Sequence, residues 1–323
     1  MSTALITGIS GQDGWYLARQ LISEGHRVVG LSRDAAAAAE AFQGWDVLPE
    51  ILGFDYSVPG AVTDVIETVR PDWVFNLASF ATGQGMFDQP RAMARLNGFF
   101  VLDLLEAIRN SPRRDGITLV QASSSEMFGD VLEMPQDEDT PLRPKSPYGA
   151  AKQYAHSMVG IYRRAFGIRA CSAILYNHES IRRPPVFVTK KIARAAARIS
   201  LGLETELVLG ALDISRDWGY APEYMDALAR MARAPEPSDY VVATGRLTSI
   251  REVVQMAFSQ LGLDWEQYVR LDTGWTRPVE SFSLCGNPGR IKRDLGWRAI
   301  TPVSDIIAEM VSHERRAAEA AAA

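Results

Sequence analysis

The chain is 323 residues long and mildly acidic, with 34 Lys plus Arg against 39 Asp plus Glu and a formal net charge of -5. This balance provides no basic field for a nucleic-acid backbone, so nucleic acid is excluded as a partner and an anionic ligand must be bound by a local cluster. No apolar run approaches the roughly 18 residues that span a membrane, and the first residues lack the pattern of a secretory signal, so we expect a cytoplasmic protein.

Cysteine and histidine form no recognisable metal-binding pattern in the sequence. The two cysteines, Cys171 and Cys285, lie far apart, and Cys171 falls in an apolar run that is typical of a buried strand. The four histidines are scattered, without the His-x-x-x-His or Cys-x-x-Cys spacing of zinc ligands. We therefore expect two free thiols, no disulfide and no bound metal.

The first half of the chain alternates short β-rich runs with helical patterns. In chain order, strands are predicted at 4–7, 27–31, 73–77, 117–122 and 170–175, and helices lie between them at 15–23, 58–69, 91–110 and 148–166. This repeated βαβ order predicts an α/β fold with a doubly wound, Rossmann-like parallel sheet. The alanine run at 35–39 is either a short solvated helix or a loop.

After residue 175 the pattern becomes less regular. Shorter helices are predicted at about 189–201, 222–232 and 250–261 among polar, proline-containing segments, and the alanine-rich end at 319–323 is expected to fray. We expect this smaller region to complete a cleft over the carboxyl edge of the sheet, where open α/β sheets bind their ligands.

Three glycines, Gly8, Gly11 and Gly14, lie in the segment ITGISGQDGWYL between the first predicted strand and the first predicted helix. Glycine at these places lets the backbone turn tightly, approach a pyrophosphate and pack helix against strand, while the helix N-terminus offers N–H groups to the phosphates. A purely structural turn is the alternative. The spacing G-x-x-G-x-x-G, rather than G-x-G-x-x-G, indicates a short-chain dehydrogenase/reductase.

The residues after the second and third apolar runs bear on the type of dinucleotide. Ser32 and Arg33 follow the second strand, which places no acid at the strand tip for a ribose 2′-hydroxyl, while Arg33 suits a 2′-phosphate. NADP is therefore favoured over NAD, although Asp34 is adjacent and Arg33 as a solvated loop charge is the alternative. Asp55 either binds the adenine amine or caps a turn.

Tyr148 and Lys152 lie four residues apart on a helix that begins near Pro147, so their side chains share one face. A lysine beside a phenol favours the phenolate and lowers its pKa, which makes the tyrosine a usable base near neutral pH. The preceding strand ends in the run QASSSE, which brings hydroxyls and the Glu126 carboxylate to the carboxyl edge of the sheet. A solvated turn with a helix cap is the alternative for the serines.

Glu126 distinguishes between possible reactions. A simple reductase or 4-epimerase moves one proton and one hydride and has no use for a second base. A dehydratase that oxidises a sugar at C4 makes the C5 proton acidic, and then needs a carboxylate to remove that proton and help expel the C6 hydroxyl.

Over nearly its full length the chain resembles the GDP-mannose 4,6-dehydratases, which are extended short-chain dehydrogenase/reductases. The matching segments are ALITGISGQDGWYLA, QASSSEMFG, PKSPYGAAKQYAH, LYNHESIRR, FVTKKIARA, SRDWGYAPEYMDA, DYVVATGRLTSIRE, TRPVE and LGW. The resemblance implies a dinucleotide-binding domain of residues 1–175, to which 213–245 returns. It further implies a nucleotide-sugar-binding region made of 176–212 and 246–323.

The resemblance assigns three groups of site residues. The catalytic residues would be Ser124, where the family usually has threonine, with Glu126, Tyr148 and Lys152. The cofactor would be bound by Gly8, Gly11, Gln12, Asp13, Gly14, Arg33, Asp55, Tyr56, Leu77, Ala78, Tyr148, Lys152 and His178. The nucleotide sugar would be bound by Asn177, Glu179, Val188, Lys191, Arg216, Arg277 and Glu280.

Several segments depart from the family pattern. Where the family commonly reads Ala-Gln-Ser this chain has Ser79-Phe80-Ala81, which leaves the sugar open because that loop borders the hexose in relatives. Phe99 and Phe100 stand where relatives are often smaller. The Arg- and Ser-rich loop that supports tetramers in relatives is here Asp34 and five alanines, so we expect a homodimer, with a homotetramer as the alternative.

These patterns together predict a nucleotide-sugar 4,6-dehydratase that converts GDP-mannose to GDP-4-keto-6-deoxy-mannose with NADP+ recycled in place. The alternatives are an NADP-dependent nucleotide-sugar 4-reductase or epimerase, a dehydratase for another GDP-linked sugar, and a non-catalytic NADP(H)-binding regulator.

Overall fold

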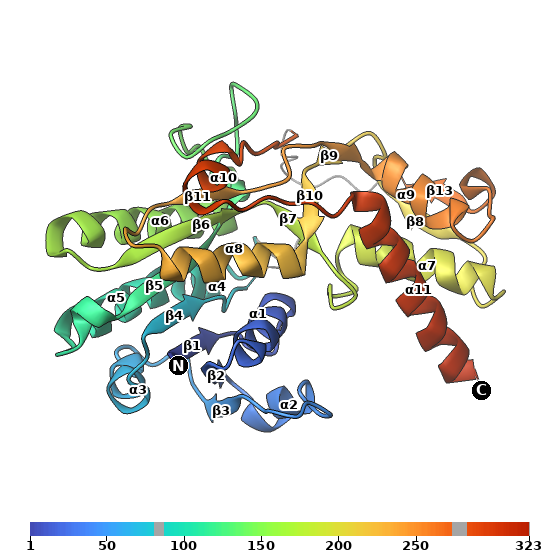
Figure 1. Cartoon of the computed structure of the whole chain (residues 1–323). Helices are drawn as coiled ribbons and strands as arrows, with labels where there is room; N and C mark the ends of the chain where they lie inside the picture. The colour runs from blue at the N-terminus through green and yellow to red at the C-terminus, as the bar shows by residue number, and fades with distance from the viewer. Residues whose placement is uncertain (81–86, 273–282, 323) are drawn as a thin grey trace.

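The computed structural model describes residues 1–80, 87–272 and 283–322. A seven-stranded sheet in the order β11-β6-β5-β4-β1-β2-β3 forms its centre, and every neighbouring pair is parallel (Figure 1). The strands are β1 (Thr3–Thr7), β2 (Arg27–Ser32), β3 (Glu50–Gly53), β4 (Trp73–Asn76), β5 (Thr118–Ser124), β6 (Ala170–Leu175) and β11 (Tyr240–Val242). The predicted α/β fold with a doubly wound parallel sheet is confirmed.

Helices cover both faces of this sheet and bury its strands on both sides; all seven residues of β5 are buried. One apolar core joins the sheet to α1 (Gln12–Ser23) and α8 (Ala221–Arg233) through residues such as Leu17, Phe75 and Leu228. The other joins the opposite face to α3 (Val62–Val69), α5 (Phe100–Asn110) and α6 (Pro147–Phe166). Strand β5 and helix α6 are thereby fixed in the middle of the molecule.

A second group of helices lies beside one end of the sheet (Figure 1). Helices α7 (Val188–Ser200), α9 (Ile250–Ser259) and α11 (Val303–Ala322) pack around their own apolar cluster, which includes Trp218 and Phe258. Three two-stranded sheets accompany them: β7 (Asn177–Glu179) with β10 (Trp218–Tyr220), β9 (Ser215–Arg216) with β12 (Thr248–Ser249), and β8 (Leu207–Leu209) with β13 (Val269–Leu271). The segment 213–245, which is predicted to return to the dinucleotide-binding domain, contains α8 and β11. The division of the chain into a dinucleotide-binding domain and a nucleotide-sugar-binding region stays a prediction.

The structure differs from the predicted elements mainly at short or alanine-rich segments. The run at 35–39 forms the short helix α2 (Ala35–Glu40), whose N-cap Asp34 accepts a hydrogen bond from the N–H of Ala37. The helix predicted from residue 58 begins at Val62, because a turn with a left-handed Gly60 precedes it. The expected fraying at 319–323 is wrong for 319–322, where α11 continues to Ala322, in keeping with the high helix propensity of alanine.

The helix predicted at 91–110 is interrupted. It consists of α4 (Pro90–Ala94), a π-helical turn (Arg95–Phe99) and α5, so Asn97 sits in a widened stretch of helix. Such π-helical turns occur frequently at functional sites. The remaining helix, α10 (Gly289–Leu295), contacts β11 at the sheet edge. Across the described ranges, no helix is long and apolar enough to cross a bilayer.

Candidate active site

The glycine-rich loop lies between β1 and α1 and turns tightly against the end of β4. Gly8 has a left-handed φ of +68°, and a Cβ at this position would lie 2.9 Å from the Cα of Ala78. A Cβ on Gly14 would lie 2.5 Å from the carbonyl oxygen of Gly8, so α1 approaches the loop very closely. Gly11 is the exposed N-cap of α1. The loop is therefore a backbone cradle at a helix N-terminus, a geometry that fits a pyrophosphate.

Tyr56 and the residues after β4 hold this loop in place. The hydroxyl of Tyr56 donates to the backbone oxygen of Leu31, near the end of β2, at 3.0 Å. It accepts a hydrogen bond from the N–H of Gly8 at 3.3 Å. Burial raises the pKa of Tyr56 to about 12. The backbone N–H groups of Leu77 and Ala78 both donate to Thr7 Oγ1, at 3.0 and 2.9 Å. Three predicted cofactor residues therefore surround the loop.

The charged residues predicted to select the cofactor are all exposed. Arg33 lies directly after β2. The neighbouring carboxylate of Asp34 caps α2 by accepting from the N–H of Ala37 at 3.0 Å. Asp55 accepts from the N–H of Ser57 at 2.8 Å, and hydrogen bonds with Ser57 lower its pKa. The turn-capping role of Asp55 is thus present in the structure, and its contact with an adenine stays a prediction.

The turn after β5 carries Ser124 and Glu126 against helix α6. Ser124 ends β5, and its Oγ accepts a hydrogen bond from the backbone N–H of Glu126 at 3.2 Å. Helix α6 begins at Pro147 with Ser146 as its N-cap. A Cβ on Gly149 would lie 2.5 Å from the backbone oxygen of Glu126, so the first turn of α6 touches the turn that carries the carboxylate. This close packing brings the two halves of the predicted catalytic set together.

Tyr148 and Lys152 complete that set on α6. The hydroxyls of Ser124 and Ser79 lie close enough to the phenol of Tyr148 to act on its pKa. Lys152 Nζ lies 5.7 Å from the centroid of the Tyr148 ring and donates to the carbonyl oxygen of Ala122 at 2.9 Å. The Lys152 side chain is buried, with 2% of its residue surface exposed. The four predicted catalytic residues therefore converge at the carboxyl edge of the central sheet.

Burial dominates the electrostatics of this cluster. It raises the pKa of Tyr148, while the hydroxyls of Ser124 and Ser79 act in the opposite direction. Burial also lowers the pKa of Lys152 to about 8, against the influence of Asp13, whose charge raises it. The net shift of the Tyr148 pKa is therefore upward in the protein chain by itself, because desolvation of the phenolate outweighs the favourable contacts. The predicted influence of Lys152 on this pKa stays a prediction.

Ser79 and Asn97 are site residues that the sequence reasoning did not identify. Ser79 Oγ donates to Asn97 Oδ1 at 3.1 Å. The amide of Asn97 is itself fixed by the backbone of Phe80, whose N–H donates to Asn97 Oδ1 at 2.9 Å and whose oxygen accepts from Nδ2 at 3.1 Å. Ser79 follows β4 as Ser124 ends β5, and carboxyl ends of adjacent parallel strands share one edge of a sheet. The order of the strands could therefore have predicted that Ser79 lies near Ser124.

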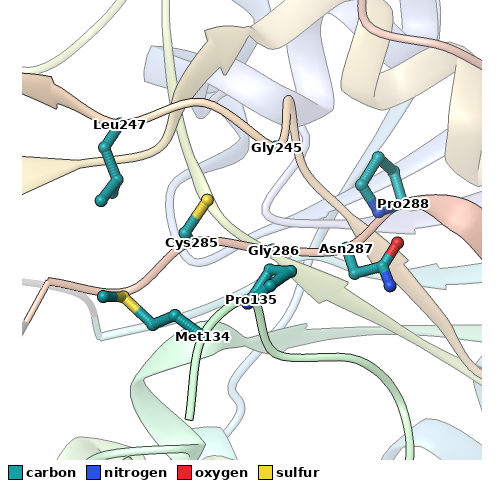
Figure 2. A pocket seen from close by; sticks show the side chains of 8 residues that line it. All are labelled: Met134, Pro135, Gly245, Leu247, Cys285, Gly286, Asn287 and Pro288. Carbon is teal, nitrogen blue, oxygen red and sulfur yellow. The ribbon is translucent and has the colours of Figure 1, made fainter.

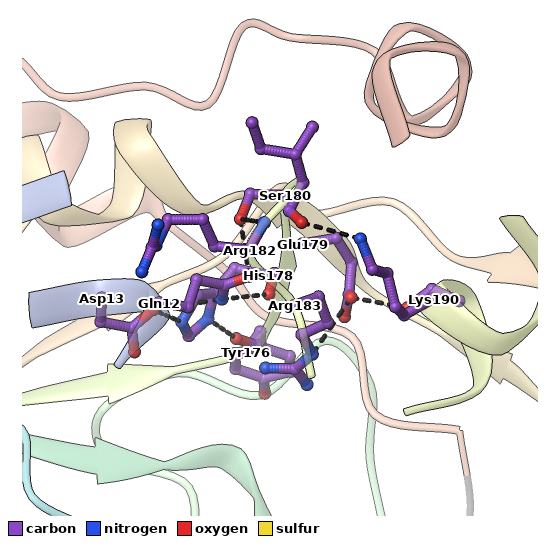
Figure 3. Close-up of polar contacts among 11 residues, drawn as sticks. Gln12, Asp13, Tyr176, His178, Glu179, Ser180, Arg182, Arg183 and Lys190 are labelled. Carbon is purple, nitrogen blue, oxygen red and sulfur yellow. Dashed lines mark hydrogen bonds and ion pairs between the residues drawn. The ribbon is translucent and has the colours of Figure 1, made fainter. Parts of the chain in front are cut away.

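The predicted residues of β7 lie next to the cofactor loop (Figure 3). Gln12 Nε2, at the start of α1, donates to the backbone oxygen of His178 at 3.1 Å, and Asp13 Oδ1 lies 3.0 Å from His178 Nε2. Glu179 is 1% exposed and accepts from the hydroxyl of Thr189 at 2.6 Å. The segment therefore joins α1 to the beginning of α7, and Asn177, which opens β7, is half-buried.

The other predicted nucleotide-sugar residues are more dispersed. Val188 opens α7, and Lys191 on the same helix donates from Nζ to a carbonyl oxygen of β8 at 2.7 Å. Arg216 lies in β9, where its guanidinium contacts the preceding carbonyl oxygen at 2.9 Å. Arg277 and Glu280 lie outside the described residues. The structure thus brings Val188 and Lys191 together on one helix, and the roles of the whole group stay predictions.

A hollow of about 410 Å³ lies near the end of β11 (Figure 2). Asp217 is buried beside it and accepts hydrogen bonds from the backbone of Thr244, Gly245 and Gly286. Cys285 lines the hollow; burial raises the pKa of its thiol, which makes it a poor nucleophile. Both cysteines are free thiols, as predicted. Within the described segments, no cluster of three or more metal-ligating side chains is present.

Comparisons with known proteins agree on one family. A family model described as GDP-mannose 4,6 dehydratase matches residues 5–310. The chain is 39% identical over 322 residues to GDP-mannose 4,6 dehydratase 2 of Arabidopsis thaliana, covering 96% of this chain and 86% of the relative.

Solved structures with a similar fold contain dinucleotides. A dTDP-glucose 4,6-dehydratase from Bacillus anthracis in complex with NAD has a TM-score of 0.84 at 17% identity, covering 99% of this chain and 98% of that one. RMD from Pseudomonas aeruginosa complexed with NADPH has a TM-score of 0.78 at 21% identity, covering 98% and 100%.

Proposed function

The chain belongs to the GDP-mannose 4,6-dehydratase family, and from this premise we propose that it is a hydro-lyase that converts GDP-mannose to GDP-4-keto-6-deoxy-mannose. One observation supports this reaction above the others: a carboxylate, Glu126, stands beside the buried cluster of Ser124, Tyr148 and Lys152. A tyrosine, a lysine and a hydroxyl are sufficient for hydride chemistry at C4, whereas elimination of water across C5 and C6 needs the additional base.

The glycine-rich loop fits a nicotinamide dinucleotide. Its cradle leaves no room for a Cβ at Gly8 or Gly14, and the N-terminus of α1 points its N–H groups to where a pyrophosphate would lie. Lys152 offers a buried ammonium group at the end of β5, where it donates to the carbonyl oxygen of Ala122. When bound, the nicotinamide supplies the uptake of a hydride from C4 of the sugar and its return to C6, so that no net oxidation results.

The chain's own residues handle the protons. Tyr148 would take the proton of the C4 hydroxyl, Ser124 would orient that hydroxyl, and the positive charge of Lys152 would stabilise the phenolate that forms. Glu126 would then remove the C5 proton, which the C4 carbonyl has made acidic, and help protonate the departing C6 hydroxyl. Burial raises the pKa of Tyr148. The phenol therefore depends on nearby positive charge to act as a base near neutral pH.

We propose NADP rather than NAD as the dinucleotide. Arg33 lies exposed at the end of β2, where it can reach a 2′-phosphate. Asp34, the adjacent acid that would repel such a phosphate, directs its carboxylate to the N-terminus of α2 instead. Asp34 therefore does not take the position of a ribose-binding acid at the strand tip.

We propose a homodimer as the assembly and the cytoplasm as the location. Helix α6 and the π-helical turn before α5 expose large apolar side chains, namely Phe99 at 54%, Ile161 at 43% and Phe166 at 42%. Such a surface favours contact with another copy. The alanine-rich α2 offers few charged groups for a further tetramer contact. The free thiols of Cys171 and Cys285 accord with a reducing compartment.

Mass spectrometry of reaction products tests the proposed reaction. The NADP+-loaded protein is incubated with GDP-mannose and with a panel of other nucleotide sugars, and loss of one water from GDP-mannose is expected. Loss of water from another sugar would keep the mechanism and change the substrate. Tight NADP binding with no turnover of any nucleotide sugar would instead support a regulatory protein.

A charge-removing variant separates the dehydratase from a reductase or epimerase. Glu126→Gln is expected to abolish water loss while C4 oxidation, followed as NADPH absorbance, is partly retained. Glu133→Gln is the matched control, because Glu133 is an exposed acid in the segment after β5. Unchanged activity of Glu126→Gln would contradict the elimination mechanism and favour the reductase or epimerase.

A further inference from the structure

Asp13 and His178 form a partly buried ion pair that the proton transfers of the proposed reaction do not use. Resting on the proposed function, we propose that Asp13 is a positioning residue. Paired with a protonated His178, it ties the cofactor loop to β7 and supplies the negative charge that keeps Lys152 in its ammonium form.

The hydrogen bonds of His178 require two protons on its ring. Nδ1 lies 2.7 Å from the backbone oxygen of Tyr176, and Nε2 lies 3.0 Å from Oδ1 of Asp13. A carbonyl oxygen only accepts hydrogen bonds, and the same holds for the oxygens of Asp13, whose lowered pKa keeps the carboxyl group ionised, so each ring nitrogen must donate. His178 is therefore an imidazolium, and Asp13 is its counter-charge.

The surroundings of the ring are consistent with this charge state. Asp13 faces it from α1, the phenol ring of Tyr224 stacks on it from α8 with centroids 4.8 Å apart, and Tyr176 precedes it on its own segment. Burial by itself lowers the pKa of His178, and the positive charge of Arg183 also lowers it. The charge and hydrogen bond of Asp13 outweigh both effects, so that the pKa of His178 is raised and that of Asp13 is lowered.

A set of hydrogen bonds around the pair joins the start of α1 to β7 and the residue after it (Figure 3). Besides its bond to the backbone of His178, Gln12 Nε2 lies 3.2 Å from Oδ1 of Asp13, and Gln12 Oε1 accepts from the hydroxyl of Ser180 at 2.8 Å. Gln12 and Asp13 directly follow Gly11 in the cofactor loop. The position of that loop therefore depends on partners about 165 residues further along the chain.

Asp13 also acts on the catalytic lysine. Its charge raises the pKa of Lys152, which burial lowers to about 8, and the ring of Tyr148 lies 5.7 Å from the ammonium nitrogen. Without the carboxylate, burial would act unopposed and Lys152 would lose its proton at a lower pH. Activity that requires the ammonium is present below the pKa of Lys152 and lost above it. Removing Asp13 should therefore move this loss to lower pH.

The protonation states can be measured directly by NMR, without any assay of activity. The chain has four histidines, and burial lowers the pKa of His26, His156 and His313. At about pH 7.5, ¹⁵N spectra should show one imidazolium and three neutral rings. The imidazolium signal should be missing in His178→Gln. In Asp13→Asn the His178 ring should give the signal of a neutral imidazole. Four neutral rings in the folded wild-type protein would overturn the proposed pair.

The link to Lys152 is tested by titrating lysine ¹³Cε signals, which are few because the chain has five lysines. In Asp13→Asn the Lys152 signal should titrate at a lower pH than in the wild type, in which burial lowers the pKa of Lys152 to about 8. Asp64→Asn is the matched control, since Asp64 is an exposed acid in the first turn of α3. An unchanged Lys152 titration in Asp13→Asn would overturn the proposed role.

The pH profile of water loss then connects the pair to the reaction. Its alkaline limb should move to lower pH in Asp13→Asn and stay in place in Asp64→Asn. A limb that does not move although the Lys152 titration has shifted would overturn the role of the pair in the reaction. If the wild-type protein dehydrates no nucleotide sugar, the proposed function fails, while the two titrations still decide the inference about Asp13.

Discussion

Gly11 and Gly14 lie three residues apart in the cofactor loop but are expected to serve different purposes. We predict that Gly14→Ala weakens the fold of the cofactor-free protein, whereas Gly11→Ala leaves that fold intact and weakens dinucleotide binding. The two variants add the same methyl group, so a difference between them reports the position of the methyl group and not its size.

The expected magnitudes follow from the space at each position. A Cβ on Gly14 would lie 2.5 Å from backbone atoms of Gly8 and Ile9, so α1 must retreat by about 0.5 Å to reach the 3.0 Å that real Cβ contacts respect. Overpacking of this kind costs about 1–3 kcal/mol, and the better helix propensity of alanine offsets up to about 1 kcal/mol. The contacted atoms belong to the backbone and cannot move aside cheaply, so the cost lies at the upper end, and we expect Gly14→Ala to lower the free energy of unfolding by about 2 kcal/mol.

The surroundings of Gly11 are more open. A Cβ there would lie 3.2 Å from the carbonyl oxygen of Gly8, and the φ of -68° suits alanine. Replacing a compatible glycine by alanine typically changes stability by less than about 1 kcal/mol, in the favourable direction. The new methyl group, however, would point from the exposed loop to where the pyrophosphate is expected, so the affinity for NADP+ should fall.

Two measurements on each variant test this reasoning. Urea unfolding of the cofactor-free proteins gives the free energy of unfolding, and calorimetric titration with NADP+ gives the affinity. A Gly14→Ala protein as stable as the wild type would refute the packing argument. A Gly11→Ala protein that binds NADP+ with unchanged affinity would refute the expected place of the pyrophosphate.

Three further predictions concern charged groups. Arg33→Ala should weaken NADP+ binding and leave NAD+ binding unchanged in calorimetric titrations; an equal loss for both would contradict a 2′-phosphate contact. Asp239 accepts hydrogen bonds of 2.9 and 2.6 Å from Arg163, and both side chains are about one-fifth exposed. Asp239→Asn should therefore lower the free energy of unfolding in urea by about 2–3 kcal/mol, and a negligible change would contradict this estimate. The stabilisation from Asp13 is complete above pH 3.8, the ordinary carboxyl pKa, and is lost as the pH falls through the lowered pKa of Asp13. The stabilisation from His178 is complete below pH 6.5, the ordinary imidazole pKa, and is lost as the pH rises through the raised pKa of His178. The difference in Tm between the wild type and His178→Gln should therefore be largest between these two values and shrink above 6.5, and a difference independent of pH would argue against the pair.

The fold could largely be predicted from the sequence because the central strands are apolar runs between amphipathic helices. The two strands of the central sheet that sequence reasoning missed are β3 and β11, which lie at its edges. Strand β3 follows the ambiguous alanine run and β11 lies in the less regular region after residue 175, so neither belongs to the clear βαβ alternation that marks the other strands. Helix α11 (Val303–Ala322) was not predicted; only fraying of its alanine-rich end was expected, because alanine supports both a helix and a frayed terminus.

The convergence of Ser124 and Tyr148 could be predicted because both follow from strand order and helical spacing. Two other aspects of the site could not. The direction of the pKa shift of Tyr148 depends on burial, which is a property of the folded chain. The pairing of Asp13 with His178 joins residues far apart in the sequence, so no local pattern indicates it. The functional roles of these residues stay predictions.

The short edges of the central sheet bear on the behaviour of the protein at high concentration. An exposed edge strand offers unpaired N–H and C=O groups on which another chain can add a strand and start aggregation. At one edge, β11 has three residues, all buried, and the N–H of Val241 donates to the carboxylate of Glu138 at 2.8 Å. At the other edge, Glu50 of the four-residue β3 binds Arg27 of β2. Both edges are thus poor templates for strand addition, which protects a long, apolar parallel sheet from edge-to-edge association.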